Sequence, residues 1–399
     1  MPINQYFTKM EQLEFRNLYS HGKGADFRGN SLGPMPQGVW ALNNEFLHNW
    51  WENGHDGHFD PTKNMKEWWL FAEQFEPLLE PIVGAKPGVS EVVVGNTLSM
   101  NNMLMLFVFL SRIKKSYKAK PTIVTTKEMF PSDLCTINFL KDSLGDFKIL
   151  QVSTKEIYDG NFPSLKSPVL GFFPGVCHVL GKRLPIEELT RAFHKAGGLI
   201  GFDLAHSFCN HELSLHDDNV DFATFPGYKY GNGGPGAVGG IFFHKNHHED
   251  NLFPSVPGWW GNDKIVRFSQ GEITPARGAR RFLASNDQVA NSLGLLAHLR
   301  NVKEAGWDNV VSWNEENSTY AYNLLLNNRK IEVVTPYNWC FRGSQLSFKH
   351  QSHDAKEVLL RLKEQDLFAE KREDFVRCAF TAINSKEEVD RFIGVLEEI

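Results

Sequence analysis

Two side chains, Asp203 and Lys229, carry the clearest chemical signal in the sequence. Asp203 ends the apolar segment GGLIGFD, and Lys229 lies between two tyrosines, directly before the Gly- and Pro-rich segment GNGGPG. Asp203 therefore stands at the carboxyl end of an expected strand, the edge at which α/β sheets bind their ligands. Aromatic, partly dry surroundings disfavour the charged form of a lysine and lower its pKa, so that a free amine becomes available as a nucleophile.

This pair of side chains meets the needs of pyridoxal 5'-phosphate (PLP), which requires a free amine and a carboxylate able to hold its pyridinium nitrogen. The pair alone is weak evidence, because a surface lysine and a helix-capping aspartate can have the same spacing. The motif FPSD, which follows the strand-like segment TIVTT, adds an aromatic ring at Phe130, a hydroxyl at Ser132 and a carboxylate at Asp133. An aromatic face can stack on a planar pyridine ring, so this turn strengthens the prediction of a PLP site.

The motif NTLSMNN indicates a phosphate site. It follows the segment EVVVG and is expected to open a helix, with Thr97 and Ser99 in or next to the first turn. Backbone N–H groups and hydroxyls at a helix N-terminus form a ready phosphate seat. Ordinary N-capping by these polar residues is the alternative.

Composition and charge argue against several classes of partner. The 399 residues carry 42 Lys and Arg against 47 Asp and Glu, with a formal charge of −5 and a pI near 6.3. Nucleic acids and anionic membranes both require concentrated positive charge, so neither is an expected partner. The longest apolar run, MLMLFVFL, is shorter than the roughly 20 residues that span a bilayer, and the N-terminal residues MPINQYFTKMEQLEF lack the pattern of a secretory signal.

The cysteines point to a cytoplasmic protein. All five are scattered and none forms a CxxC pair, which is typical of reduced thiols and gives no support to a disulfide framework or a zinc site. We therefore expect a cytoplasmic protein with no bound metal, whose partner is a small molecule.

The spacing of apolar segments predicts an α/β fold. The expected strands are EVVVG, PTIVTT, FKILQV, PVLGFF, GGLIGFD and GGIFFH, and a helical pattern precedes the fifth of them. Strands that alternate with helices in this way indicate βαβ units and a mostly parallel sheet covered on both faces. Beyond Gly271, two long helical patterns (Asp287–Ala305 and Trp307–Asn328) precede short strands and helices of an α+β type. Residues 36–85 read as two amphipathic helices.

These patterns divide the chain into three parts. We expect an N-terminal segment (1–45) that packs with the small domain, a large cofactor-binding domain (46–285) and a small C-terminal domain (286–399).

The motifs, taken together, resemble those of the kynureninase family. FRGNSLGPMP, NTLSMNN, FPSD, DLAH, DFATFPGYKYGNGGPG, GWWG, ASN and RGSQLSF occur in the order and spacing of that family, from about Phe27 to Arg377. The resemblance implies PLP fold type I, the fold of aspartate aminotransferase. Its large domain has a mostly parallel, seven-stranded sheet flanked by helices, and its smaller C-terminal domain is α+β.

The resemblance also implies an activity and an assembly. The expected enzyme is a hydrolase that cleaves the Cβ–Cγ bond of L-kynurenine, its 3-hydroxy form or both, releasing anthranilate or 3-hydroxyanthranilate and L-alanine. This reaction belongs to tryptophan catabolism and NAD biosynthesis. A homodimer is expected, and the 31 Phe and 10 Trp favour a large, aromatic-rich interface.

Residue roles follow from the resemblance by position. Lys229 matches the lysine that binds the cofactor covalently, Asp203 matches the partner of the pyridine nitrogen, and Tyr228 is the third implied catalytic group. The positions implied to contact the cofactor are Leu98, Ser99, Phe130, Ser132, Asp133, Asp203, His206, Tyr228, Lys229, Trp259 and Asn286. The positions implied to contact the substrate are Ser31, His55, Asn286 and Arg377. Of these, His55 and Asn286 face the aryl ring and Arg377 binds the α-carboxylate.

The chain departs from the family pattern at three places. Asn262 stands where the family usually has His, SNDQ replaces the usual SNPP, and Gly227 replaces a small polar residue before Tyr228. The first alternative is another fold-type-I activity, such as a class V aminotransferase or a cysteine desulfurase. A desulfurase needs a nucleophilic cysteine on a mobile loop, and neither Cys340 nor Cys378 has such a setting. The second alternative is a non-catalytic PLP-fold protein, which the presence of Lys229 and Asp203 disfavours.

Overall fold

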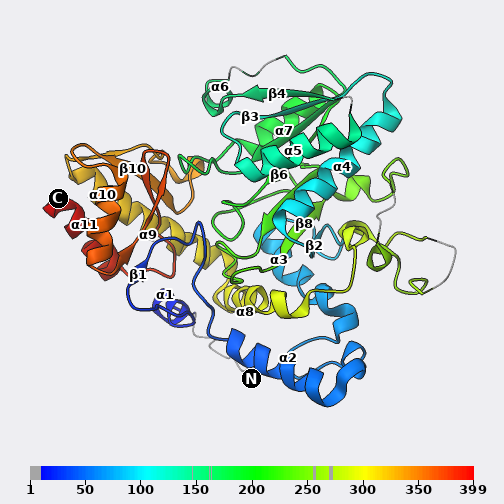
Figure 1. Cartoon of the computed structure of the whole chain (residues 1–399), viewed down its shortest axis with the longest axis horizontal. Coiled ribbons are helices and arrows are strands. Elements are labelled where there is room, and N and C mark those ends of the chain that lie inside the picture. Colours follow the sequence, from blue (N-terminus) through cyan, green and yellow to red (C-terminus); the bar gives the residue numbers. More distant parts are fainter. Residues whose placement is uncertain (1–9, 146, 161, 163, 255–257, 269–272) are drawn as a thin grey trace, which may run out of the picture.

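A computed structural model describes residues 10–399 except 146, 161, 163, 255–257 and 269–272. The first nine residues of the predicted N-terminal segment therefore lie outside the described part. Figure 1 shows a large α/β body next to a smaller α+β body that carries the C-terminus.

A seven-stranded sheet forms the centre of the large body. Its strands are β2 (Val92–Val94), β3 (Thr122–Thr126), β4 (Lys148–Val152), β5 (Val169–Pro174), β6 (Leu199–Asp203), β7 (Phe222–Pro226) and β8 (Gly239–Phe243). The strand order is β2-β8-β7-β6-β5-β3-β4. Strands β7, β6, β5, β3 and β4 pair in parallel, and β8 runs antiparallel to both of its neighbours. The mostly parallel, seven-stranded sheet is thus confirmed, and β7 is the strand that the apolar pattern did not single out.

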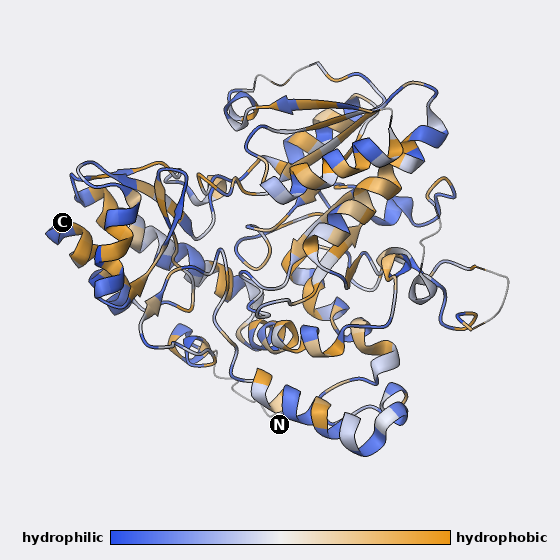
Figure 2. Cartoon of the chain, viewed as in Figure 1, coloured by the Kyte–Doolittle hydropathy of each residue, from blue (hydrophilic) through white to orange (hydrophobic). Residues whose placement is uncertain are grey.

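Helices cover this sheet and complete its core. They are α3 (Glu76–Val83), α4 (Leu98–Ser116), α5 (Pro131–Leu144), α6 (Thr154–Tyr158), α7 (Ile186–Lys195) and α8 (Val289–Ala305). Helix α4 packs on β7 and β8, and α7 packs on β5 and β6. Strands β7 and β8 are buried along their full length, as expected when both faces of a sheet are covered. Figure 2 shows the central strands coloured mostly as hydrophobic and many outer helix turns as hydrophilic.

The small body is an antiparallel sheet packed on helices. Strands β9 (Ile331–Val333), β10 (Gln345–His350), β12 (Glu370–Arg372) and β13 (Phe375–Ala379) lie in the order β12-β13-β10-β9. Helices α9 (Trp307–Asn327), α10 (Ala355–Glu364) and α11 (Lys386–Glu398) contribute to the same core. The predicted α+β character is confirmed.

The packing changes from one body to the other within α9. Leu293, Leu295 and Leu299 of α8 belong to the core of the large body, whereas α9 contributes Ala321 and Leu325 to the core of the small body. Helix α8, which the sequence patterns assigned to the small domain, therefore packs with the large one. Helical periodicity shows that a face is apolar but not which core it faces. The domain limits themselves stay a prediction.

The N-terminal segment contacts both bodies. It contains α1 (Gln12–Arg16) and β1 (Ala25–Asp26), and β1 pairs in parallel with β11 (Leu367–Phe368) of the small body. Phe15 of α1 is buried in the core of the large body instead. The segment then leads into α2 (Val39–Asn53) and a 3₁₀ turn (Gly54–His58). The second helix that the sequence predicted before Ala85 begins as a 3₁₀ turn (Trp68–Gln74) and continues as α3.

Gly33, in the motif GNSLG, packs directly on the loop that carries Lys229. The N–H of Gly33 donates to the carbonyl of Tyr228 at 3.0 Å. A Cβ atom at Gly33 would lie 1.8 Å from Oδ1 of Asn232 and 2.3 Å from the carbonyl oxygen of Lys229. Only glycine permits this close approach of two backbone segments, so the motif positions the Lys229 loop.

Replacing Gly33 with alanine should therefore destabilise the protein by about 1–3 kcal/mol, because a backbone carbonyl must move to admit the methyl group. The matched control is Gly394→Ala in α11, where a Cβ would meet no heavy atom within 4 Å. Urea unfolding of both variants checks this expectation. Equal stability of the two variants would contradict the close approach at Gly33.

Candidate active site at the carboxyl ends of β6 and β7

Lys229 is buried in the loop that follows β7. Its side chain is almost inaccessible, with 9% of the residue exposed. The Nζ atom lies 3.1 Å from Nε2 of His206 and 5.7 Å from the ring centre of Phe130. Burial lowers the pKa of Lys229 to about 8, against the opposing effect of the Asp203 carboxylate. A sizeable fraction of the amine is therefore free near neutral pH, as the sequence predicted.

Asp203 is the last residue of β6, and it is held by two N–H donors. Nδ2 of Asn102 donates to Oδ2 at 3.1 Å, and the N–H of Ala205 donates to Oδ1 at 2.7 Å. Asp133 from α5 lies beside it and accepts from Nδ2 of Asn102 at 2.8 Å. Burial and the Asp203 charge raise the pKa of Asp133 well above its usual range. Burial raises the pKa of Asp203 as well, but Lys229 and the two N–H donors oppose that effect, so the proton of this pair resides on Asp133, which donates to Asp203.

Asn102 is a site residue that the sequence analysis missed. It lies in the first half of α4, is fully buried, and accepts a hydrogen bond from the hydroxyl of Thr224 in β7. Its side chain therefore contacts Asp133, Asp203 and Thr224 at once. Asn102 is the last residue of the motif NTLSMNN, but the sequence alone does not show that this asparagine is buried or which side chains it bonds to.

Phe130, His178 and His206 form an uncharged wall next to Lys229. Phe130 is the N-cap residue of α5, where Pro131 starts the helix, and its ring meets His178 edge-on at 5.2 Å. Burial lowers the pKa of His178 to about 3 and the pKa of His206 well below its usual range, so both rings are neutral. Nδ1 of His206 is buried without a hydrogen-bond partner in the described part of the chain, so a polar atom is left available to a ligand.

Arg377 and Ser31, two predicted substrate contacts, meet in the structure through Glu370. Arg377 is almost fully buried in β13, and its Nε donates to Oε1 of Glu370 at 2.9 Å. Ser31 donates to Oε2 of Glu370 at 2.6 Å, and Nη2 of Arg377 lies 3.4 Å from the Ser31 hydroxyl. Nη1 of Arg377 donates to the carbonyl of His178. The sequence analysis did not identify Glu370, because an acidic residue on an edge strand has no distinctive pattern.

The predicted phosphate seat is the start of α4. Leu98 is the first helical residue, Ser99 lies in the first turn with its side chain exposed, and the Thr97 side chain makes no capping hydrogen bond. The first N–H groups of the helix are therefore available to an anion.

Three predicted residues gather at a different place. Trp259 packs edge-on against Trp260 at 4.9 Å between ring centres, and His55 lies 5.3 Å from His58. Asn286 lines a cavity of about 450 Å³ together with His58 and aromatic side chains of α2. Within the described residues, none of Trp259, His55 and Asn286 makes a hydrogen bond or ring contact with Lys229.

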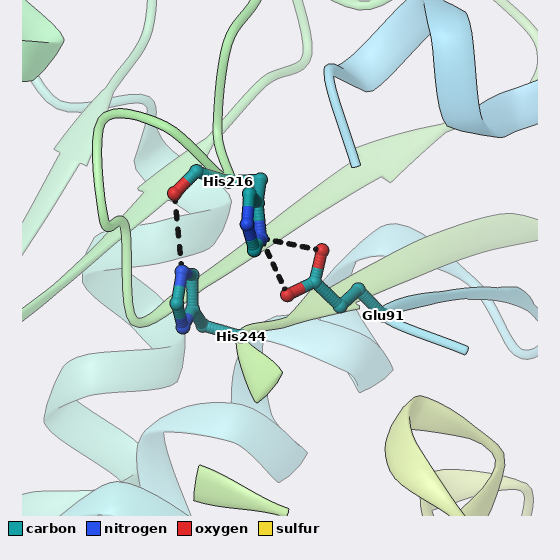
Figure 3. Close-up of side chains that lie close together, drawn as sticks. All are labelled: Glu91, His216 and His244. Atoms are coloured by element: carbon teal, nitrogen blue, oxygen red, sulfur yellow. Dashed lines mark hydrogen bonds and ion pairs between the residues drawn. The ribbon is translucent and has the colours of Figure 1, made fainter. Parts of the chain in front are cut away.

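A second group of titratable side chains lies away from Lys229, and Figure 3 shows its three members, Glu91, His216 and His244. Nδ1 of His216 lies 2.9 Å from Glu91, whose carboxylate also accepts the N–H groups of Lys86 and Lys245. Nε2 of His244 donates to the carbonyl of His216, and its Nδ1 accepts from Asn246. Both oxygens of Glu91 and both nitrogens of His244 are thus already bonded. The group ties β2 and β8 to the loop before β7 and is explained without a metal ion.

Comparison with known proteins first identifies the class of protein to which this chain belongs. The family model described as Aminotransferase class-V matches residues 34–392. A solved structure of a variant of the cystine C–S lyase C-DES, with glycine linked to PLP, matches with a TM-score of 0.78 at 17% identity, over 98% of this chain and 100% of the other. A cysteine desulfurase from Thermococcus onnurineus matches with a TM-score of 0.78 at 20% identity, over 97% of each chain. The predicted fold, PLP fold type I, is confirmed.

Curated relatives then give the family. Kynureninase from Flavobacterium psychrophilum is 34% identical over 86% of this chain and 83% of its own length. Kynureninase 2 from Aspergillus niger is 32% identical over 93% and 86% of the two chains, and the enzyme from Myxococcus xanthus is 32% identical over 92% and 88%. The chain belongs to the kynureninase family, and its cofactor is PLP.

The residues around Lys229 fit this cofactor. They provide a buried amine, a carboxylate held as an anion at Asp203, an aromatic face at Phe130 and an unpartnered polar atom on His206. No described helix has both the length and the apolar character that a membrane crossing requires.

The pKa of Lys229 predicts how cofactor uptake depends on pH. Only the neutral amine attacks an aldehyde, so the rate at which apoprotein acquires the visible absorbance of bound PLP should rise with pH through a midpoint of about 8. Asp203→Asn should move this midpoint to lower pH, because the Asp203 carboxylate raises the pKa of Lys229. Stopped-flow absorbance measures both midpoints. A midpoint near the ordinary pKa of lysine would contradict the burial of this amine. Lys229→Ala, which has no amine to bind PLP, is the negative control.

Proposed function

We propose that this protein hydrolyses L-kynurenine, its 3-hydroxy form or both at the Cβ–Cγ bond, producing anthranilate or 3-hydroxyanthranilate and L-alanine. The observation that carries the proposal is the coincidence of two findings. The relatives named kynureninase match most of the chain, and residues from distant motifs converge at Lys229 with burial and charge suited to PLP chemistry. Such an enzyme serves tryptophan catabolism and NAD biosynthesis.

Lys229, Tyr228 and Asp203 are the proposed catalytic residues. When bound, PLP supplies an electron sink for bonds at the amino-acid Cα. The Lys229 amine, with a pKa of about 8, is suited to remove the Cα proton and return it. Burial raises the pKa of Tyr228, whose ring centre lies 6.0 Å from Nζ of Lys229, so its phenol stays protonated and can donate. Asp203, held by the N–H donors of Asn102 and Ala205, would be the anionic partner of the protonated pyridine nitrogen.

The remaining roles are proposed by the same argument. Leu98 and Ser99 at the start of α4 would hold the phosphate, while Phe130, Ser132, Asp133 and His206 would contact the cofactor around its ring. Arg377 with Ser31 would bind the α-carboxylate, since a guanidinium can hold a carboxylate by two hydrogen bonds.

The alternative of cysteine desulfurase chemistry finds little support. Burial raises the pKa of the Cys378 thiol in β13 well above its usual range, which keeps it unreactive. Cys340 is exposed and lines a surface groove with Tyr158 and Arg183, away from Lys229. The five cysteines are all unpaired, and this pattern supports the proposed cytoplasmic location.

Incubation of the purified, PLP-loaded protein with L-kynurenine should produce anthranilate, which is followed by its fluorescence, and an equal amount of L-alanine. Lys229→Ala should abolish turnover, because both covalent cofactor attachment and proton transfer depend on this amine. Parallel assays with 3-hydroxykynurenine give the preference between the two substrates. Absence of turnover of either compound by holoenzyme would overturn the proposed function.

The protein is proposed to act as a homodimer. Trp40, Trp50 and Trp51 of α2 are 65%, 60% and 85% exposed, and the predicted ligand contacts His55 and Asn286 lie near the end of the same helix. A soluble protein rarely exposes so many indole rings unless they meet a partner. We infer that Trp259, His55 and Asn286 complete the active site of the neighbouring subunit.

Subunit complementation tests this arrangement. Lys229→Ala and Trp259→Ala should each be nearly inactive alone, whereas unfolding and refolding them together should restore about a quarter of the wild-type activity, because half of the dimers are mixed and one site in each mixed dimer is intact. The control mixes Lys229→Ala with Asp203→Asn, which lie in the same site and cannot complement. No recovery in the first mixture, or a stable and active monomer in sedimentation, would contradict the shared site.

A further inference from the structure

Arg377 and Ser31, the proposed ligands of the substrate α-carboxylate, form the carboxylate clamp, and a carboxylate of the protein already neutralises its charge. Arg377 is the proposed carboxylate ligand, yet it already forms an ion pair with Glu370, and its side chain is 1% exposed in that pair. Asn30 and Ser31 donate to the same carboxylate and hold it in place. The Arg377–Glu370 pair therefore carries no net charge. An anionic substrate gains hydrogen bonds from Arg377 but little net attraction.

Arg372 lies beside this pair without a counter-ion. It stands two residues after Glu370 on β12, and alternate residues of a strand point to the same face. Its guanidinium carbon lies 5.7 Å from the ring centre of Phe130. Its Nε atom is buried and has no hydrogen-bond partner, and Arg372 forms no ion pair within the described residues.

The charge of Arg372 reaches into the site. It contributes to lowering the pKa of His178 and of Arg377, and its guanidinium lies by the ring of Phe130 that His178 also contacts. The other cations near Glu370 each face an anion: Lys229 faces Asp203, Arg377 pairs with Glu370, and Arg28 pairs with Asp26. Among these cations of the described chain, Arg372 is the one without an ion-pair partner.

We propose that Arg372 is a substrate-binding residue that supplies the net positive charge for the α-carboxylate, while Arg377 and Ser31 supply oriented hydrogen bonds. This inference rests on the proposed function, since it assumes an amino-acid substrate. An unpaired Nε is the position from which a guanidinium offers two parallel N–H groups to a carboxylate. Glu370 then acts as a positioning residue that fixes the Arg377 guanidinium.

The test compares L-kynurenine with its carboxamide, in which a neutral group replaces the carboxylate. In holoenzyme, Arg372→Gln should raise the KM for L-kynurenine about 10- to 100-fold, the effect of one charge-assisted hydrogen bond, with a smaller change in kcat. The inhibition constant of the carboxamide should change less than about two-fold, because this ligand has no charge for Arg372 to attract. Lys371→Gln is the matched control, since it removes the same charge from the next, exposed residue of β12.

Three further measurements separate the outcomes. Arg372→Lys keeps the charge but loses the planar guanidinium, so its KM for L-kynurenine should lie between those of wild type and Arg372→Gln. If the glutamine variant does not fold, the lysine variant provides the test. The dissociation constant of PLP and the visible spectrum should match those of wild type. Suppose that Arg372→Gln weakens PLP binding but leaves the ratio of the KM for kynurenine to the inhibition constant of the carboxamide unchanged. This result would assign Arg372 to the cofactor phosphate and overturn the proposal.

Equal weakening of kynurenine and its carboxamide would show a structural role only, which also overturns the proposal. Failure of the wild-type holoenzyme to turn over kynurenine is a different result. It would remove the proposed function and, with it, the basis for assigning a carboxylate to Arg372.

Discussion

The cost of burying charge governs the arrangement around Lys229. A lysine, two aspartates and an arginine lie almost out of contact with water here, although each is costly to bury unless it is paired or neutralised. The cost is reduced in a different way for each group. Burial lowers the pKa of Lys229, and Asp133 holds a proton. Asp203 accepts two N–H hydrogen bonds, and Arg377 forms an ion pair with Glu370. The same compensation keeps the amine nucleophilic and the Asp203 carboxylate ionised, so the requirements of folding and of the proposed chemistry coincide.

The site also depends on contact between the two bodies. Lys229 and Asp203 follow strands of the large sheet, whereas Glu370 and Arg377 lie on strands of the small one. The segment after β5 joins them: the carbonyl of His178 accepts from Gln345 at 3.2 Å, and that of Val179 accepts from Ser347 at 2.7 Å. His178 thus contacts Phe130 with its ring and Arg377 with its carbonyl. Displacement of one body would therefore separate the carboxylate clamp from the amine, and neither body alone contains both.

Part of this arrangement was predictable from the sequence, for physical reasons that differ between residues. Asp203 and Phe130 were identified because they follow strands whose apolar pattern is strong, and Lys229 because a Gly-rich loop follows it. The apolar pattern did not single out strand β7 (FATFP), and the helical periodicity of α8 did not show which core its apolar face contacts, so the domain limits stay a prediction. Asn102 and Glu370 were missed because they bond to partners that are distant in sequence: Asp203 lies 101 residues from Asn102, and Ser31 lies 339 residues from Glu370. Within the described residues, Trp259, His55 and Asn286 make no hydrogen bond or ring contact with Lys229, so their roles stay predictions from the family resemblance.

Two of the three departures from the family pattern place side chains that make local hydrogen bonds near the proposed aryl pocket. Asn262, which stands in place of the usual histidine, accepts the N–H of Thr274 through Oδ1 at 2.6 Å. Asp287, which replaces a proline, accepts the N–H of Ala72 at 2.6 Å, and burial raises its pKa to about 7. Both side chains therefore stabilise the loops that flank Asn286 and Trp259. The third departure, Gly227, lies apart from these loops, two residues before Lys229, where a Cβ atom would lie 2.4 Å from the carbonyl oxygen of Val238.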